Sequence, residues 1–73
     1  MPEFKDRLKA VRKSHKATQK QVALAVGVSE RNYQDWEYGT FNPTLSALVA
    51  LADFFDVSID YLCGRTDNPE VNR

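Results

Sequence analysis

The side chains that most often carry catalysis or bind metals are sparse in this chain of 73 residues. It contains one cysteine, Cys63, and one histidine, His15, and no nucleophile lies at a usable spacing from a base. One Cys and one His cannot complete the ligand set of a structural zinc site, and no phosphate-binding loop is present. A core of this size has no room for a substrate pocket. The sequence therefore predicts no enzyme activity, no cofactor, no metal and no small-molecule substrate.

Charge is distributed unevenly along the chain, although the formal net charge is zero. Residues 1–20 carry seven Lys or Arg against two acids, and residues 44–73 carry two basic residues against five acids. A basic segment favours a nucleic-acid partner, whereas a net charge of zero does not. His15 lies within the basic segment, so we expect it at the surface, and we expect Cys63 to be a small buried residue.

Composition also predicts the compartment. No apolar run approaches the roughly 18 residues that a membrane span needs, and the amino terminus lacks the apolar stretch of a signal peptide. The single cysteine excludes an internal disulfide and fits a reducing environment. We therefore expect a soluble, cytoplasmic protein without membrane contacts.

Apolar periodicity predicts one all-α domain, and its first two helices are marked clearly. Phe4, Leu8 and Val11 form a helical stripe within a helix from Glu3 to about Ser14. The sequence Thr18-Gln19-Lys20-Gln21 is a capping box of the Thr-x-x-Gln type, which predicts the start of a second helix. That helix ends at Gly27, because glycine adopts the left-handed conformation at little cost.

A third helix follows after a very short turn. Ser29 is its predicted N-cap, the helix runs over residues 30–37, and Gly39 ends it. Tyr33 and Trp36 are three residues apart and therefore share one face. We expect both rings to pack in the core.

Two more helices complete the predicted domain, residues 1–64. The fourth begins after Thr44, and its apolar stripe consists of Leu45, Leu48, Leu51, Ala52 and Phe55. A short fifth helix covers residues 59–63 and stops at Gly64. Residues 65–73 have no apolar periodicity and are expected to form a flexible C-terminal tail.

Several separate motifs agree in order and spacing with a known family. They are Thr18-Gln19-Lys20-Gln21-Val22-Ala23-Leu24-Ala25-Val26-Gly27-Val28-Ser29, Trp36-Glu37-Tyr38-Gly39, Pro43-Thr44-Leu45 and Val57-Ser58-Ile59-Asp60-Tyr61-Leu62. Over about residues 4–64 the chain resembles the Cro/repressor-type (Xre-like) helix-turn-helix family. The resemblance implies a compact five-helix, lambda-repressor-like domain in which the second and third helices form the helix-turn-helix.

The resemblance also implies a function. It suggests a sequence-specific transcriptional regulator, bacterial or phage-encoded, that represses by binding double-stranded DNA through the major groove. Because one such domain contacts about half a site, we expect a homodimer on a palindromic operator.

The resemblance further implies which residues contact DNA. They are Gln19, Lys20, Ser29, Glu30, Arg31, Asn32, Gln34, Asp35 and Asn42. Gln19 would contact a phosphate near the amino end of the second helix, and the exposed residues of the third helix would read bases. Arg31 could pair with guanine, Asn32 or Gln34 with adenine, and Glu30 with a cytosine amino group.

Two structural roles follow in the same way. Arg12 and Glu37 match positions that form a partly buried ion pair in similar proteins, although two separately solvated charges remain an alternative. Ala23 would allow a close crossing of the second and third helices, unless it is only a good helix former. Phe41, Phe54 and Tyr61 exceed what the core needs, so they are candidates for a dimer interface; isolated exposed aromatics are also common.

One alternative function remains open. The carboxylates of Glu30 and Asp35 lie where phosphates would approach, and the loop Thr40-Phe41-Asn42 lacks the usual Lys or Arg. The two carboxylates favour a protein-interaction module of the same fold, with an antirepressor or a toxin as partner and little DNA affinity, whereas Arg31, Asn32 and Gln34 favour DNA. If the domain binds DNA, the cation-free loop implies that binding relies more on backbone amides, Gln19, Lys20 and the first helix.

Overall fold

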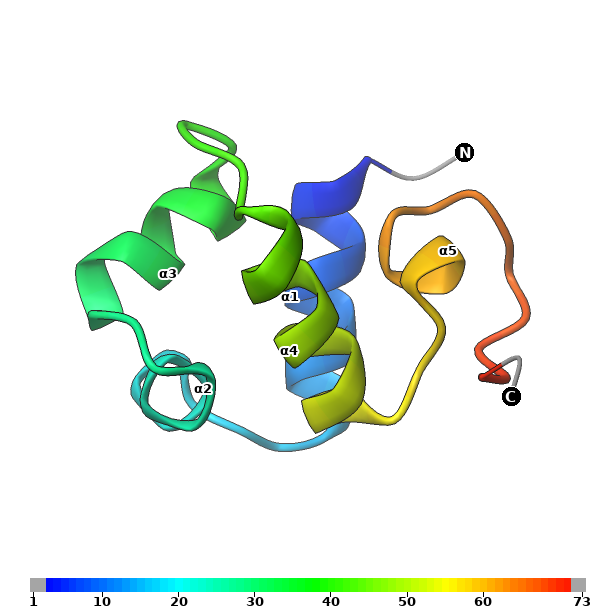
Figure 1. The fold of residues 1–73 in the computed structure, drawn as a ribbon, viewed down its shortest axis with the longest axis horizontal. Coiled ribbons are helices and arrows are strands. Elements are labelled where there is room, and N and C mark those ends of the chain that lie inside the picture. The colour runs from blue at the N-terminus through cyan, green and yellow to red at the C-terminus, as the bar shows by residue number, and fades with distance from the viewer. Residues whose placement is uncertain (1–2, 72–73) are drawn as a thin grey trace.

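The structure is a computed structural model that describes residues 3–71. Within this range the chain forms five α-helices, labelled in Figure 1: α1 (Phe4–Ser14), α2 (Gln19–Val26), α3 (Glu30–Tyr38), α4 (Leu45–Phe55) and α5 (Ile59–Leu62). The predicted all-α, five-helix architecture is confirmed. Residues 1, 2, 72 and 73, which belong to the expected domain and tail, lie outside the described residues. No helix in residues 3–71 is both long and apolar enough to cross a membrane.

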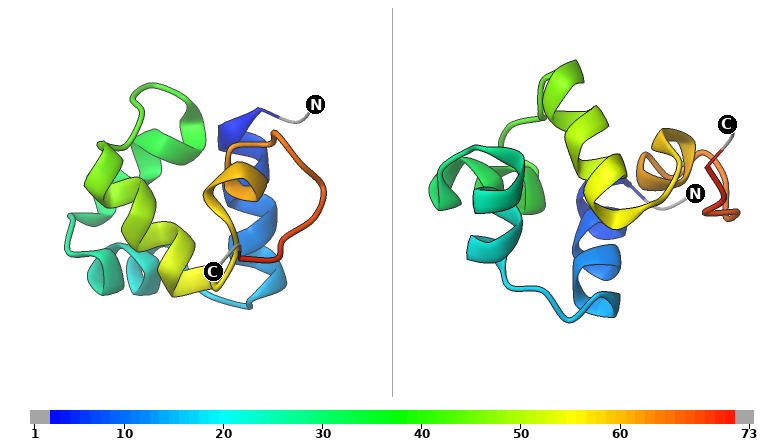
Figure 2. Two further views of the ribbon diagram at one scale, coloured as in Figure 1. Left: turned by 45° about the vertical axis from the view of Figure 1, so that its right-hand side comes forward. Right: turned by 60° about the horizontal axis from the view of Figure 1, so that its bottom comes forward.

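The helices are arranged so that α2 and α3 occupy one end of the molecule. α2 packs against α3 and α4, whereas α1 contacts α3 and α5. α4 also contacts α5, and Figures 1 and 2 show α5 and the C-terminal segment at the opposite end. The outer faces of α2 and α3 are therefore available to a partner.

The predicted capping residues fix the ends of α2 and α3. The Thr18 hydroxyl accepts a hydrogen bond from the Gln21 amide at 3.0 Å, and the Gln21 side chain accepts one from the Thr18 amide at 2.9 Å. The Ser29 hydroxyl accepts from the Asn32 amide at 3.0 Å. Gly27 ends α2 with a φ of 81°, a left-handed conformation that costs glycine little. This turn sets the direction in which α3 leaves α2.

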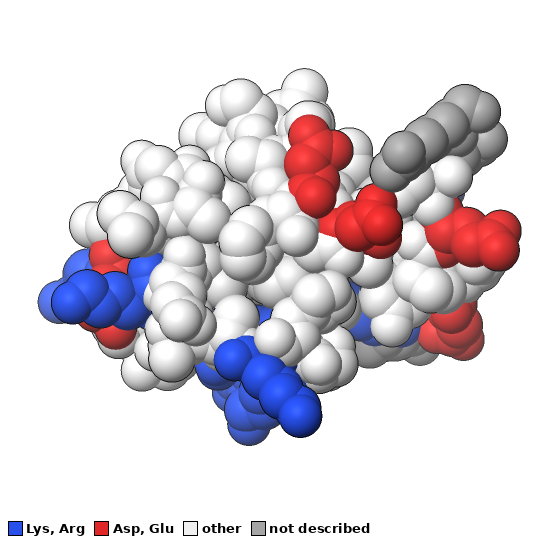
Figure 3. Space-filling view, turned by 90° about the horizontal axis from the view of Figure 1, so that it is seen from below, with Lys and Arg blue, Asp and Glu red and all other residues white. Residues whose placement is uncertain are grey.

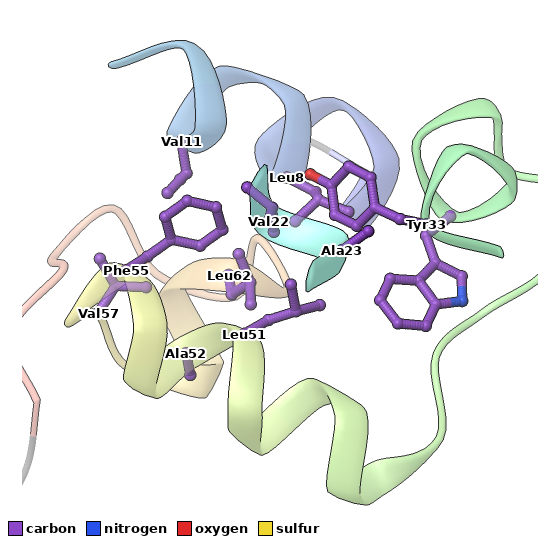
Figure 4. Packing of buried hydrophobic residues seen from close by; sticks show 11 residues of the cluster. Leu8, Val11, Val22, Ala23, Tyr33, Leu51, Ala52, Phe55, Val57 and Leu62 are labelled. Atoms are coloured by element: carbon purple, nitrogen blue, oxygen red, sulfur yellow. The ribbon is translucent and has the colours of Figure 1, made fainter. Parts of the chain in front are cut away.

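The hydrophobic core receives a side chain from each helix. Figure 4 shows Leu8 from α1, Val22 from α2, Tyr33 from α3, Leu51 from α4 and Leu62 from α5 converging on one volume. All five are fully buried. Removing a side chain of this kind from water contributes about 1.5–3 kcal/mol, so these residues hold the helices in place.

Leu45 does not belong to the core, contrary to expectation. Leu51, Ala52 and Phe55 are buried and Leu48 is half-buried, but Leu45 is 75% exposed. It is the first residue of α4 and extends beyond the part of that helix that packs on its neighbours. The helical spacing identified the correct face but could not show how far along the helix that face is covered.

His15 is at the surface, as expected, whereas Cys63 is less buried than expected. His15 is exposed, but its ring packs edge-on against Phe55 with centroids 5.1 Å apart, and its Nε2 lies 3.1 Å from the Phe55 carbonyl oxygen. These contacts join the end of α1 to the end of α4. Cys63 is only half-buried, and it caps α5, which ends one residue earlier than predicted, at Leu62.

The C-terminal segment, described over residues 65–71, forms no helix in that range but contacts α1 and α5. Arg7 is a buried arginine whose guanidinium donates to the carbonyl oxygens of Tyr61 at 2.9 Å and Thr66 at 3.2 Å, and to the Asp67 carboxylate at 3.0 Å. The Ser58 amide also donates to the carbonyl oxygen of residue 69 at 3.0 Å. The expected division at residue 64 stays a prediction, but part of the expected tail is hydrogen-bonded to α1 and α5.

Candidate nucleic-acid interface

The unit formed by α2 and α3 is built on close packing around the turn. Ala23 is buried where α2 meets α3, and its carbonyl oxygen accepts a hydrogen bond from the Val28 amide at 3.0 Å. Tyr33 and Trp36 are both buried, as expected, and their rings make an edge-to-face contact with centroids 5.7 Å apart. This inward side leaves the opposite side of α3 exposed.

The outer side of α3 carries the polar residues that the sequence singled out. Glu30, Arg31 and Asn32 are exposed at its amino end, and Gln34 and Asp35 are half-buried. The Arg31 side chain is 86% exposed, and its Nε lies 3.9 Å from an Asp35 carboxylate oxygen. An exposed pair at this distance is weak, because water screens the attraction. The Arg31 guanidinium can therefore exchange Asp35 for another acceptor.

Beneath this surface, Glu37 accepts hydrogen bonds from four donor groups. Arg12 donates to it twice, from Nε at 2.6 Å and from Nη2 at 3.1 Å. Gln19 Nε2 donates at 3.1 Å, and the Tyr33 hydroxyl also donates. Glu37 is 2% exposed, so the ion pair with Arg12 lies in the interior and joins α1 to α3.

The electrostatics of this network follow from its burial. Burial alone would raise the pKa of Glu37, but the hydrogen bonds from Arg12, Tyr33 and Gln19 outweigh it and lower that pKa. Burial raises the pKa of the Tyr33 hydroxyl, and donation to Glu37 raises it further. The hydrogen bond to Glu37 likewise raises the pKa of Arg12. Glu37 and Arg12 are therefore both charged near neutral pH, and Tyr33 keeps its proton.

Gln19 and Gln34, both expected at the DNA surface, are linked to Glu37. Gln34 Nε2 donates to Gln19 Oε1 at 3.3 Å, while Gln19 Nε2 donates to Glu37. Neither these bonds nor the role of the Tyr33 hydroxyl was predicted from the sequence. Tyr33 and Glu37 are four residues apart on α3, and that spacing was the one available signal. Gln19 comes from another helix, so its bond to Glu37 could not be read from spacing.

The other expected DNA contacts lie at the two ends of α3. Lys20 and Glu30 are both exposed and line one hollow between α2 and the start of α3. The Ser29 hydroxyl is engaged as the cap of α3. Asn42 is exposed in the loop beyond the carboxyl end of α3. It lines a hollow together with Gly39, which caps α3, and Phe4 of α1.

The three candidate dimer residues are placed differently from one another. Phe41 and Phe54 are exposed, and the Phe54 ring also contacts Phe55. Tyr61 is half-buried and stacks under the Arg7 guanidinium, 4.1 Å from the ring centroid. Much of the Tyr61 surface is therefore used within the domain.

Charge is separated across the surface as well as along the sequence. Figure 3, seen from below the view of Figure 1, shows Lys and Arg mainly at the left and lower edges and most of the acids at the upper centre and right, with some acidic atoms among the basic ones at the left. Asp53 of α4 and Asp60 of α5 are both exposed, at the end away from α3. These two acids are thus separate from α3, although Glu30 and Asp35 place carboxylates on the outer side of that helix.

Within residues 3–71, no group of His, Cys, Asp and Glu side chains could hold a metal ion. Burial raises the pKa of the Cys63 thiol, and Asp60 raises it further, which disfavours the reactive thiolate.

Comparison with known protein families identifies this architecture. Residues 8–62 match the family described as helix-turn-helix. The chain is 42% identical over 64 residues to YobD, an uncharacterized HTH-type transcriptional regulator of Bacillus subtilis, covering 88% of this chain and 57% of YobD. It is 44% identical over 62 residues to RstR, a cryptic phage CTXphi transcriptional repressor of Vibrio cholerae, covering 85% of this chain and 55% of RstR. The chain thus spans a little over half the length of these relatives.

Solved structures give the same result. The P22 c2 repressor, crystallised in complex with a synthetic operator, is similar with a TM-score of 0.80 and 32% identity, covering 85% of this chain and 94% of that one. A transcriptional regulator from Listeria innocua has a TM-score of 0.80 and 31% identity, covering 85% of this chain and 58% of that one. These relatives are named as regulators and repressors rather than as enzymes.

Proposed function

The chain belongs to the helix-turn-helix family, of the Cro/repressor (Xre-like) type, and we propose that it binds double-stranded DNA as a sequence-specific repressor of transcription. The observation that carries this proposal is the division of α3 into two sides. Tyr33, Trp36 and Glu37 are buried, while Glu30 and Arg31 are exposed at the amino end of the helix. This is the end that a helix-turn-helix inserts into the major groove.

The exposed side chains have the hydrogen-bonding groups that base edges require. Arg31 is bound only weakly to Asp35, so its guanidinium can pair with O6 and N7 of a guanine. Asn32 can pair with adenine, and Glu30 can accept from a cytosine amino group. Gln34 is oriented by Gln19 and would contribute at the edge of this surface.

Phosphate contacts would position the domain. Gln19 and Lys20 lie at the amino end of α2, where the helix dipole favours an anion. Ser29 at the start of α3 and Asn42 in the following loop would contact the backbone on either side of the bases. We propose that the Asp35 carboxylate accepts from a base or keeps Arg31 in place, since it would otherwise repel phosphate.

We further propose that two copies bind a palindromic operator, because a single helix-turn-helix contacts about one half-site. Phe41 and Phe54 are the exposed aromatics available to such a dimer, and Tyr61 would add only the part of its ring that Arg7 does not cover. Operator binding of this kind would take place in the cytoplasm of a bacterium, whether the gene is chromosomal or phage-derived.

Selection from a random pool of DNA duplexes tests the proposal. The protein would be incubated with the pool at roughly physiological salt, and the bound fraction recovered over several rounds and sequenced. We expect an enriched palindrome with half-sites about 10 base pairs apart. Recovery of nothing above the input pool would contradict DNA binding and favour the protein-interaction alternative.

Variants on α3 make the test specific to the surface proposed. Arg31→Ala and Asn32→Ala should each relax the preference at one base position, costing about 1–3 kcal/mol against the selected site. Arg65→Ala removes an exposed arginine at the other end of the molecule, beyond α5, and serves as the matched control. Equal effects of Arg31→Ala and Arg65→Ala would contradict base reading by α3.

A further inference from the structure

The loop that follows α3 has no cation of its own, but a lysine from α1 lies against it. The sequence from Gly39 to Thr44 contains no Lys or Arg. In the structure, a Cβ atom on Gly39 would lie 2.8 Å from Lys5 Cδ and 3.7 Å from Lys5 Nζ. Gly39 also has a φ of 84°, so glycine serves both the backbone conformation and the close approach of the lysine.

The Lys5 stem is covered while its ammonium stays accessible. The side chain is 42% exposed, and Nζ lies 3.8 Å from a carboxylate oxygen of Glu3, which is itself largely exposed. Such a long, exposed ion pair contributes little and is readily exchanged. Lys5 and Asn42 line the same hollow, of about 240 Å³, together with Gly39. A cation and an amide from different parts of the chain therefore meet at the carboxyl end of α3.

The length of α3 relates this hollow to the proposed DNA site. A helix of nine residues is about 13 Å long, and the major groove is about 12 Å wide. If the amino end of α3 lies in the groove, its carboxyl end lies near a sugar-phosphate strand that borders the groove. We propose that Lys5 is a phosphate-contacting residue, acting with Asn42, that supplies the cation missing from the loop. This inference rests on the DNA-binding function proposed above.

The neighbouring acid gives the proposal a second consequence. Glu3 competes with phosphate for the Lys5 ammonium, because both are anions on the same cation. Replacing Glu3 by glutamine should therefore tighten DNA binding, whereas replacing Lys5 by glutamine should weaken it. A purely structural role of Lys5 on Gly39 would leave the salt dependence of binding unchanged when the lysine charge is removed.

The salt dependence of binding to the selected duplex is the direct test. Each neutralised phosphate contributes about 0.9 to the slope of log affinity against log salt. Lys5→Gln should lower the magnitude of the slope by about this amount. The ratio of the wild-type affinity to the Lys5→Gln affinity should therefore fall by about 3.5-fold between about 50 and 200 mM salt. The loss should be equal on the selected duplex and on an unrelated one, because phosphates carry no sequence information. Lys5→Arg should retain the wild-type slope.

Lys13→Gln is the matched control. It makes the same charge change on the same helix, at an exposed position. By helical spacing Lys13 shares a face with Asp6 and Ala10 rather than with Lys5, so it serves as a lysine away from the loop. If Lys5→Gln and Lys13→Gln change the slope equally, or if Glu3→Gln weakens binding, the role of Lys5 is refuted while DNA binding stands. If the wild type itself does not bind DNA, the proposed function fails, and this inference fails with it.

Discussion

Replacing Arg12 by methionine should leave Glu37 as a charged group in the interior without its cation. Methionine keeps the length and helix propensity of the arginine stem but provides no donor. Glu37 is 2% exposed, and methionine offers no donor in place of the two lost hydrogen bonds. Arg12 also donates to the Ala17 carbonyl oxygen at 3.1 Å, and that bond is lost as well.

The expected cost can be worked out from these contacts. Removing one partner of a buried ion pair costs about 3–5 kcal/mol. Tyr33 and Gln19 still donate to Glu37, so we expect the lower end, about 3 kcal/mol at neutral pH. A domain of this size has a total stability of about 4–11 kcal/mol. The variant should therefore lose a large part of its stability.

The cost should also depend on pH. In the wild type the pKa of Glu37 is lowered, so its contribution is present above the ordinary glutamate pKa of about 4.3 and is lost as the pH falls through the folded value. Without Arg12, burial is no longer outweighed, and the pKa of Glu37 should rise. A raised pKa contributes stability at low pH that is lost as the pH increases. The difference between wild type and variant should thus be largest near pH 7 and shrink toward about pH 4.

Urea unfolding followed by the fluorescence of the buried Trp36 measures this difference. Arg31→Met is the control, because it removes an exposed arginine with a weak ion pair and should cost at most about 0.5 kcal/mol. A cost for Arg12→Met below about 1 kcal/mol near pH 7 would refute the reasoning. So would a difference between wild type and variant that does not change with pH.

Three further predictions concern stability. Leu51→Ala should lower the free energy of unfolding in urea by about 2–5 kcal/mol, because Leu51 is fully buried. Leu45→Ala, at an exposed position of the same helix, should change it by at most about 0.5 kcal/mol. Equal losses in the two variants would contradict the burial of the α4 face. Thr18→Ala should cost about 1 kcal/mol through loss of the capping box, and an unchanged urea midpoint would argue against that cap. Arg7→Met should make the C-terminal segment more susceptible to proteolysis and faster in amide hydrogen exchange, because Arg7 holds that segment on the domain. Asp67→Asn changes an exposed partner and should have a small effect. Wild-type protection of the segment in Arg7→Met would contradict this anchoring.

The helices could be predicted from sequence because their signals are local. Caps such as Thr18 and Ser29, and the glycine at 27, act within a few residues of themselves. The exposed side of α3 could be predicted for the same reason, since Tyr33 and Trp36 mark its inward face by spacing alone. The family resemblance added the pairing of Arg12 with Glu37, which spacing could not supply.

The features that sequence analysis missed depend on residues far apart in the chain. Gln19 donates to Glu37 from another helix, and Lys5 lies against Gly39 across more than thirty residues of sequence. Arg7 binds backbone oxygens of residues 61 and 66, and backbone acceptors carry no residue-specific signal. The spacing of apolar residues identifies the apolar side of a helix. Only the packed structure shows how much of that side a neighbouring helix covers.

Amide chemical shifts in ¹⁵N-labelled protein, measured while the selected duplex is added, test the central claim most directly. We expect the largest changes at residues 29–35 and at Gln19 and Lys20, with smaller ones at Lys5 and Asn42. The exposed acidic residues of α4 and α5, such as Asp53 and Asp60, should change least outside any dimer contact. Changes confined to α4 and α5, or none on adding duplex, would contradict DNA recognition by α3.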